Sequence, residues 1–174
     1  WRSQPDPHEL SVQAASVLAS GGKGVLWFQG SVDLGLKDHP KSWQAFKDFN
    51  LKVNSIGNLI RISDPAPLAK TRRNNVLSQA LRGDDFIIAI AVNMNVTRKP
   101  GDMRCLIKGS DRWELGDIFD ILSVSVPREV GVTEVLEVTE NGLKKVEDFF
   151  LEVRDVKIPL EMDQDVPYKI YLLR

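Results

Sequence analysis

Few of the residue types that usually carry chemistry occur together in this sequence of 174 residues. Cys105 is the single cysteine, which excludes an intrachain disulfide and a cysteine-rich zinc site. We interpret Cys105 as a small buried strand residue, because no histidine-containing motif accompanies it as a nucleophile would require. His8 and His39 stand alone at the starts of expected helices, so we expect surface residues and not metal ligands.

Two charged segments have residue types found in binding sites, but each lacks other residues that such a site requires. Glu161, Asp163 and Asp165 offer the hard oxygen ligands that calcium takes, yet the glycine and distal glutamate of an EF-hand are missing. We favour a solvated turn over a calcium site and predict no metal. The basic run at residues 70–73 has no interleaved aromatics, which favours a solvated connection over a nucleic-acid site.

The overall composition excludes several classes of partner. The net charge is −1, with 23 basic and 24 acidic residues, so no global field favours nucleic acid or an anionic membrane. No apolar run approaches the ~20 residues that span a bilayer. Hydrophobic content of 43% is that of a globular protein able to bury a core. We expect no nucleic-acid and no membrane partner.

The first residues predict a capped helix followed by a buried strand. Asp6 is a suitable N-cap, Pro7 fits the first helical position, and Glu9 completes a capping box. Two glycines at residues 21–22 end the helix, since glycine accepts the left-handed cap conformation. Residues 23–30 are a short apolar run bracketed by glycines, which predicts a strand buried on both faces, as in a parallel sheet.

A second helix is expected to begin at Pro40 and to pack against a sheet. Its apolar positions recur three and four residues apart, and Trp43 is expected on the same side. These positions are Phe46, Phe49, Val53, Ile56 and Ile60. Helix, buried strand, loop and helix form the order of an α/β fold, but one strand cannot make a sheet. We therefore expect residues 1–63 to be a fragment whose partner strands lie elsewhere.

The remaining residues change to short β segments separated by turns. Residues 64–75 begin with two prolines close together and are predicted to be a linker. Hairpin turns are predicted at residues 82–85 and at Asn141-Gly142. The expected strands are 76–81, 86–92, 103–108, 121–126, 132–138, 143–150, 151–158 and 168–173. This number and spacing of strands predicts a β-sandwich over residues 76–174.

Residues 7–64 resemble the end of the (β/α)8 barrel in clan-A-like glycoside hydrolases. The resemblance rests on Pro-x-Glu-Leu opening a helix, on Ala-Ser-Gly-Gly-Lys-Gly-Val-Leu-Trp-Phe as the eighth strand, and on a helix carrying Trp43 and Asn50. In many such enzymes a stretch ending in Asp-Pro leads into a C-terminal β-sandwich, as residues 64–65 would here. The implied fold class is α/β plus all-β, a terminal βα unit of a TIM barrel followed by an antiparallel β-sandwich.

The resemblance also implies where sugar would bind. Active sites of these barrels lie at the carboxyl ends of the strands. That end corresponds here to Trp27 and Gln29, an indole able to stack on a pyranose ring and an amide able to hydrogen-bond a sugar hydroxyl. Trp1 precedes the first helix and is expected to line the same cleft. The alternative for Trp27 is packing in the core of the barrel.

The resemblance implies a hydrolase whose catalytic groups lie outside this chain. Glycoside hydrolysis takes two carboxyl groups flanking the scissile bond, and in these enzymes both lie on earlier strands. Asp33 and Asp38 fall in the loop after the eighth strand but match no motif, so no catalytic residue is assigned. No organic cofactor is expected. The expected partners are a carbohydrate substrate and the rest of the barrel.

The function implied is thus the C-terminal portion of a glycoside hydrolase acting on an oligo- or polysaccharide, with part of the sugar-binding cleft and a supporting sandwich. One alternative is a non-catalytic carbohydrate-binding sandwich, which predicts a ladder of exposed aromatic residues. Another is a protein-interaction domain of α+β type, complete as written, with residues 25–28 paired to the sandwich. Of the cellular locations, a secreted or periplasmic one is favoured.

Overall fold

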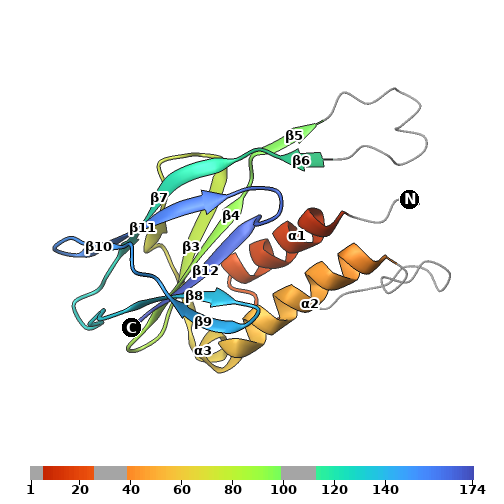
Figure 1. The fold of residues 1–174 in the computed structure, drawn as a ribbon. Coiled ribbons are helices and arrows are strands. Elements are labelled where there is room, and N and C mark those ends of the chain that lie inside the picture. Colours follow the sequence, from red (N-terminus) through yellow and green to blue (C-terminus); the bar gives the residue numbers. More distant parts are fainter. Residues whose placement is uncertain (1–5, 26–38, 99–112) are drawn as a thin grey trace.

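The computed structural model describes residues 6–25, 39–98 and 113–174 (Figure 1). Three helices come first in the chain: α1 Pro7–Ala19, α2 Pro40–Ser55 and α3 Gly57–Ile62. The strands follow: β1 Asp64–Ala66, β2 Ala69–Lys70, β3 Val76–Arg82, β4 Ile87–Asn93, β5 Val96–Arg98, β6 Trp113–Leu115, β7 Ile118–Ser125, β8 Val135–Thr139, β9 Gly142–Lys145, β10 Phe150–Leu151, β11 Asp155–Met162 and β12 Tyr168–Leu173. No helix among the described residues is long and apolar enough to cross a membrane.

The elements form three layers, helices over a sheet over a second sheet. The six-stranded sheet has the order β1-β3-β4-β12-β8-β9, and the four-stranded sheet the order β10-β11-β7-β2. Their strands pair antiparallel, and β5 pairs with β6 in a separate hairpin. Figure 1 shows α1 and α2 side by side across the outer face of the six-stranded sheet. The predicted antiparallel sandwich is confirmed in this coarse form.

Strand β4 lies at the centre of both hydrophobic cores. Its side chains alternate between two faces, and every one of them is buried. Ile88, Ile90 and Val92 pack in the cluster that includes the helices. Ile87, Ala89 and Ala91 pack in the other cluster, against β7 and β11. An antiparallel strand usually has one solvated face. Here the helical layer covers the face that would otherwise be solvated.

Helix α1 begins and ends as the sequence predicts. The Glu9 carboxylate accepts a hydrogen bond from the Asp6 backbone N–H at 2.9 Å, as in a capping box. At the other end the Gly21 N–H donates to the Leu18 carbonyl and the Gly22 N–H to the Val17 carbonyl, both at 2.9 Å. Gly21 has a φ of +87°, so the helix ends in a Schellman motif.

The second predicted helix is interrupted, and part of its apolar stripe points elsewhere. It forms α2 and α3, separated at Ile56, and Phe49, Ile56 and Ile60 are buried against the sheet. Trp43 is not part of the core that α2 forms with the six-stranded sheet, and its expected packing against a barrel sheet stays a prediction. Trp43 is six residues from Phe49, which places the two side chains about 120° apart around the helix. The Trp43 ring stacks instead on Phe46, with 5.4 Å between centroids.

The predicted linker contains two short strands. Strand β1 pairs with β3 in the six-stranded sheet, and β2 pairs with β7 in the four-stranded sheet. Residues 64–75 therefore take the chain from the six-stranded sheet to the four-stranded sheet and back towards β3 of the six-stranded sheet. The Lys23 side chain fastens the end of α3 nearby, donating to the Ile60 carbonyl at 3.0 Å and to the Ser63 carbonyl. Lysine often satisfies the last carbonyls of a helix in this way.

Both predicted hairpin turns are present. The Gly83 N–H donates to the Phe86 carbonyl at 3.0 Å in the turn between β3 and β4. Gly142 has a φ of +112° and pairs with Thr139 at the end of the β8–β9 hairpin. The strand expected at 103–108 lies outside the described residues. The one expected at 143–150 is divided, because β9 ends at Lys145 and β10 begins at Phe150.

Candidate functional site

The predicted sugar-binding residues are not among the described residues. Trp1, Trp27 and Gln29 lie outside them, as do Asp33 and Asp38. The strand predicted for residues 23–30 is described only up to Val25, and residues 23–25 have no regular secondary structure. The barrel strand and its carboxyl end therefore remain predictions. The described chain nevertheless contains a cleft of its own.

This cleft lies between the start of α1, the polar side of α2 and loops at one end of the sandwich. It has a volume of about 910 Å³. Its polar lining comes from elements far apart in sequence: Asp6, His8 and Ser11; Lys41, Gln44, Asp48 and Lys52; Glu114; Glu140; Gln164, Asp165 and Tyr168. Concave sites of about this size are where small ligands bind. We call it the α2–sandwich cleft.

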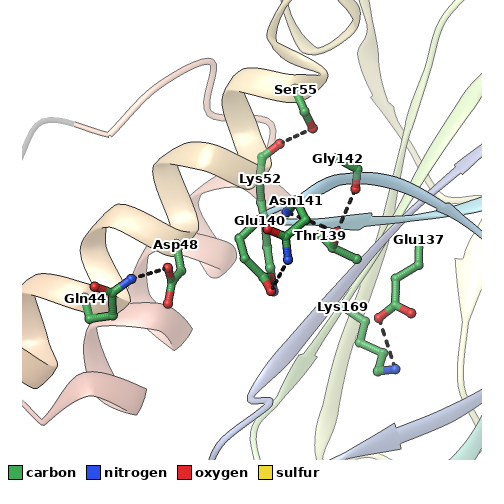
Figure 2. Close-up of polar contacts among 10 residues, drawn as sticks. All are labelled: Gln44, Asp48, Lys52, Ser55, Glu137, Thr139, Glu140, Asn141, Gly142 and Lys169. Atoms are coloured by element: carbon green, nitrogen blue, oxygen red, sulfur yellow. Dashed lines mark hydrogen bonds and ion pairs between the residues drawn. The ribbon is translucent and has the colours of Figure 1, made fainter.

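The helix α2 contributes polar groups at intervals of four residues. Gln44, Asp48 and Lys52 share one side of the helix, because residues four apart are neighbours on its surface. The Gln44 amide donates to a carboxylate oxygen of Asp48 at 2.7 Å (Figure 2). The spacing of these three polar residues is a signal present in the sequence, but it does not show which segment faces them.

The opposite wall comes from the β8–β9 turn. Glu140 accepts a hydrogen bond from the Asn141 amide at 3.2 Å through one carboxylate oxygen. Its other carboxylate oxygen is 4.0 Å from the Lys52 ammonium. Figure 2 draws both side chains. The turn itself is held by Thr139, whose hydroxyl donates to the Gly142 carbonyl at 2.8 Å. Glu140 is thereby fixed opposite Lys52.

Tyr168, at the start of β12, lies beneath the Lys52 side chain. The ammonium is 4.7 Å from the centre of the Tyr168 ring, a cation–π contact. Phe49 packs edge-on against the same ring with 5.9 Å between centroids. Burial lowers the pKa of Lys52, and this effect is opposed by Glu140, Glu137 and Asp48. Burial also raises the pKa of Tyr168 above its usual value, with Asp48 and Glu140 adding to the effect.

His8 was expected at the surface, and the structure corrects this. The acidic segment at residues 161–165 was expected to be a solvated turn, and the structure supports this. His8 is 8% exposed and lines the cleft, because α1 packs against both α2 and the sheet. In the acidic segment Asp163 accepts a hydrogen bond from the Val166 N–H at 2.7 Å and so caps a turn. Among the described residues no group of histidine, cysteine and acidic side chains has an arrangement suited to a metal ion.

Chemically, the α2–sandwich cleft offers hydrogen-bond donors and acceptors from charged, amide and hydroxyl groups. Such a set suits recognition of a polar ligand. We assign it no catalytic role.

Comparison with known proteins finds solved structures of similar fold but no matching family. The sequence matches no protein-family model and no curated protein. Among solved structures, a cycloisomaltooligosaccharide glucanotransferase of Paenibacillus sp., complexed with cycloisomaltoheptaose, matches with a TM-score of 0.57 and 14% identity. The match covers 96% of this chain and 27% of that chain. A glycoside hydrolase family 30 subfamily 8 xylanase from Clostridium acetobutylicum matches with a TM-score of 0.48 and 10% identity. That match covers 99% of this chain and 40% of the xylanase chain.

These two neighbours are carbohydrate-active enzymes, and the first shares the fold described above at low identity. This chain spans about a quarter of the length of the glucanotransferase chain.

Proposed function

We propose that this chain is the C-terminal portion of a glycoside hydrolase acting on an oligo- or polysaccharide. Residues 1–63 would supply the last βα unit of a (β/α)8 barrel, and residues 76–174 a sandwich that packs against it. The likeness to part of the glucanotransferase fold supports this proposal. The activity itself would then belong to a longer protein of which this chain is a part.

The observation that carries the proposal is the core that the helices share with the six-stranded sheet. Ala15 and Leu18 of α1, with Phe49 of α2, are in one buried cluster with Ile90 and Ile170 of the sheet. A sandwich joined to helices in this way cannot move independently of them. If the helices belong to a barrel, the sandwich supports that barrel from outside.

Helix α2 has the apolar distribution that such a position requires. Phe49 and Ile56 face the sheet, whereas Trp43 and Phe46 stack together on a different side. A helix that is apolar on more than one side is usually covered by more than one layer. In the proposed barrel the second layer is the ring of parallel strands, to which residues 23–30 would contribute. Trp27, Gln29 and Trp1 would contact the sugar at the ends of those strands.

The rival proposal, a carbohydrate-binding sandwich, would favour a row of exposed aromatic rings. Phe119 of β7 and Phe150 of β10 are 62% and 64% exposed. Their partners on β11 are Glu161 and Lys157, four residues apart. At about 3.4 Å per residue the two rings are offset by roughly 14 Å along the strands, so they do not form a continuous row.

The proposal is tested by comparing this chain with the full-length product of its gene. We expect the purified, mass-verified chain of 174 residues to release no reducing sugar from dextran or xylan, because the catalytic carboxyl groups lie elsewhere. The full-length product is expected to hydrolyse at least one polysaccharide of a panel. Turnover by the chain alone would overturn the proposal, and so would a full-length product that is inert towards the whole panel.

A further inference from the structure

The Lys52 ammonium is largely buried and has no hydrogen-bond acceptor among the described residues. Its side chain is only 18% exposed, its nearest carboxylate oxygen is 4.0 Å away on Glu140, and the Tyr168 ring lies beneath it. No acceptor among the described residues lies within hydrogen-bond distance of this nitrogen. An ammonium has three N–H donors, and leaving them without acceptors away from water costs free energy. An oxygen atom of a ligand in the cleft would remove that cost.

The charge of the cleft restricts what can supply that oxygen. Among the described residues that line it, there are five carboxylates and two lysine ammonium groups. The carboxylates are those of Asp6, Asp48, Glu114, Glu140 and Asp165, and the ammonium groups are those of Lys41 and Lys52. An anionic ligand would be opposed by the excess of negative charge, since like charges at short range in a partly buried site repel strongly. A neutral oxygen is therefore the better partner for Lys52.

The hydrogen-bonding groups of the cleft also restrict which functional groups the ligand can carry. A carboxylate is an acceptor only, so Asp48 and Glu140 are best satisfied by a ligand that donates hydrogen bonds. Lys52 donates only, so it takes a ligand that accepts. A hydroxyl group does both. Gln44, which already donates to Asp48 at 2.7 Å, holds that carboxylate in place for such a ligand.

We propose that the α2–sandwich cleft binds a neutral polyhydroxylated ligand, a saccharide unit whose hydroxyl oxygen accepts from Lys52 while its hydroxyl hydrogens are donated to Asp48 and Glu140. The cleft volume of about 910 Å³ accommodates a short oligosaccharide. The inference goes beyond the proposed function, because the cleft is formed by α1, α2 and loops of the sandwich and needs no barrel. It would hold sugar away from the bond that is cleaved.

Titration of the full chain with short oligosaccharides tests this. Isomaltohexaose and xylohexaose are the neutral probes, and hexagalacturonate is the anionic one, with heat of binding and backbone amide shifts as readouts. We expect a neutral probe to bind and to move the amides of residues 139–142 and 164–168. Lys52→Met keeps the length of the side chain but removes the donor, and it is expected to weaken binding at least tenfold. Lys47→Met, on the same helix outside the cleft lining, should bind as the unmodified chain does.

Glu140→Gln gives an independent check if Lys52→Met does not fold, and it should also weaken binding. The inference is overturned if neither neutral probe binds at about 10 mM, if hexagalacturonate binds more tightly, or if both cleft variants bind normally. The first of these results would mean that water alone fills the cleft. Sugar binding in this cleft together with an inert full-length product would keep this inference and reject the proposed function. An active full-length product without sugar binding in this cleft would keep the proposed function and reject this inference.

Discussion

Replacing Leu18 by alanine is expected to lower the free energy of unfolding of the entire chain by about 2–5 kcal/mol. Leu18 is 3% exposed, in the cluster that joins α1 to the six-stranded sheet. Removing its side chain leaves a cavity between the helical layer and β4, because neighbours in a packed core relax only in part. Helices and strands share that core, so they should still unfold in one transition.

Chemical denaturation followed by far-UV circular dichroism and by tryptophan fluorescence measures this effect. Leu51→Ala is the matched control, since Leu51 lies on α2 and is 52% exposed. Its cost should stay within about 0.5 kcal/mol. Equal costs for the two variants, or helices that unfold before the strands, would show that the helices are not part of the core of the sandwich.

The second large effect is expected in alkali, where the chain should lose about 2 kcal/mol of stability per pH unit above pH 10.5. Tyr168 and Tyr171 are 4% and 2% exposed. Burial raises the pKa of both phenols, with Asp48 and Glu140 adding to it at Tyr168 and Glu137 at Tyr171. In the unfolded chain each phenol ionises near pH 10, while in the folded chain it keeps its proton.

The sign follows from the number of bound protons. Above about pH 10 the folded state binds more protons than the unfolded state, so raising the pH favours unfolding. The stability is fully present below pH 10 and is lost as the pH rises towards the folded pKa values. Lys52 acts in the opposite sense, because burial lowers its pKa, and its effect fades as the pH rises past its unfolded value of about 10.5. Comparison with a tyrosine variant isolates the tyrosine, because Lys52 is the same in both chains.

Tyr171→Phe provides the control for this prediction. Tyr171 lies in the core between the two sheets, so phenylalanine should fit with little change in stability at pH 7. The variant is expected to lose about half of the alkaline effect in urea denaturation measured between pH 10.5 and 11.5. An unchanged slope would mean that the Tyr171 phenol ionises in the folded chain as easily as in the unfolded one.

Local features of the fold could be predicted from the sequence because short-range chemistry determines them. The capping box of Asp6 and Glu9, the glycine end of α1 and the hairpin turns near Gly83 and Gly142 each involve residues adjacent in the chain. The packing of helices over one face of the sandwich was not predicted. The sequence feature that indicates it is the unbroken apolar run of β4, because such a run is typical of a strand buried on both faces.

The α2–sandwich cleft could not be predicted in the same way. Lys52 and Glu140 are separated by many strands in sequence and come together only because β8 and β9 lie beneath α2. The position of Tyr168 under Lys52 likewise depends on the strand order of the six-stranded sheet. Spacing within α2 showed which groups share a side of the helix, but not which segment faces them.

The measurement that tests the account most directly is native-state hydrogen exchange on the purified chain. It compares the amides of residues 25–28 with those of residues 87–92 in β4. We predict fast exchange in the first set, because a barrel strand without its neighbours has no partners for its N–H groups, and strong protection in the second. Equally strong protection of both sets would contradict the account, since residues 25–28 would then belong to a fold complete in itself.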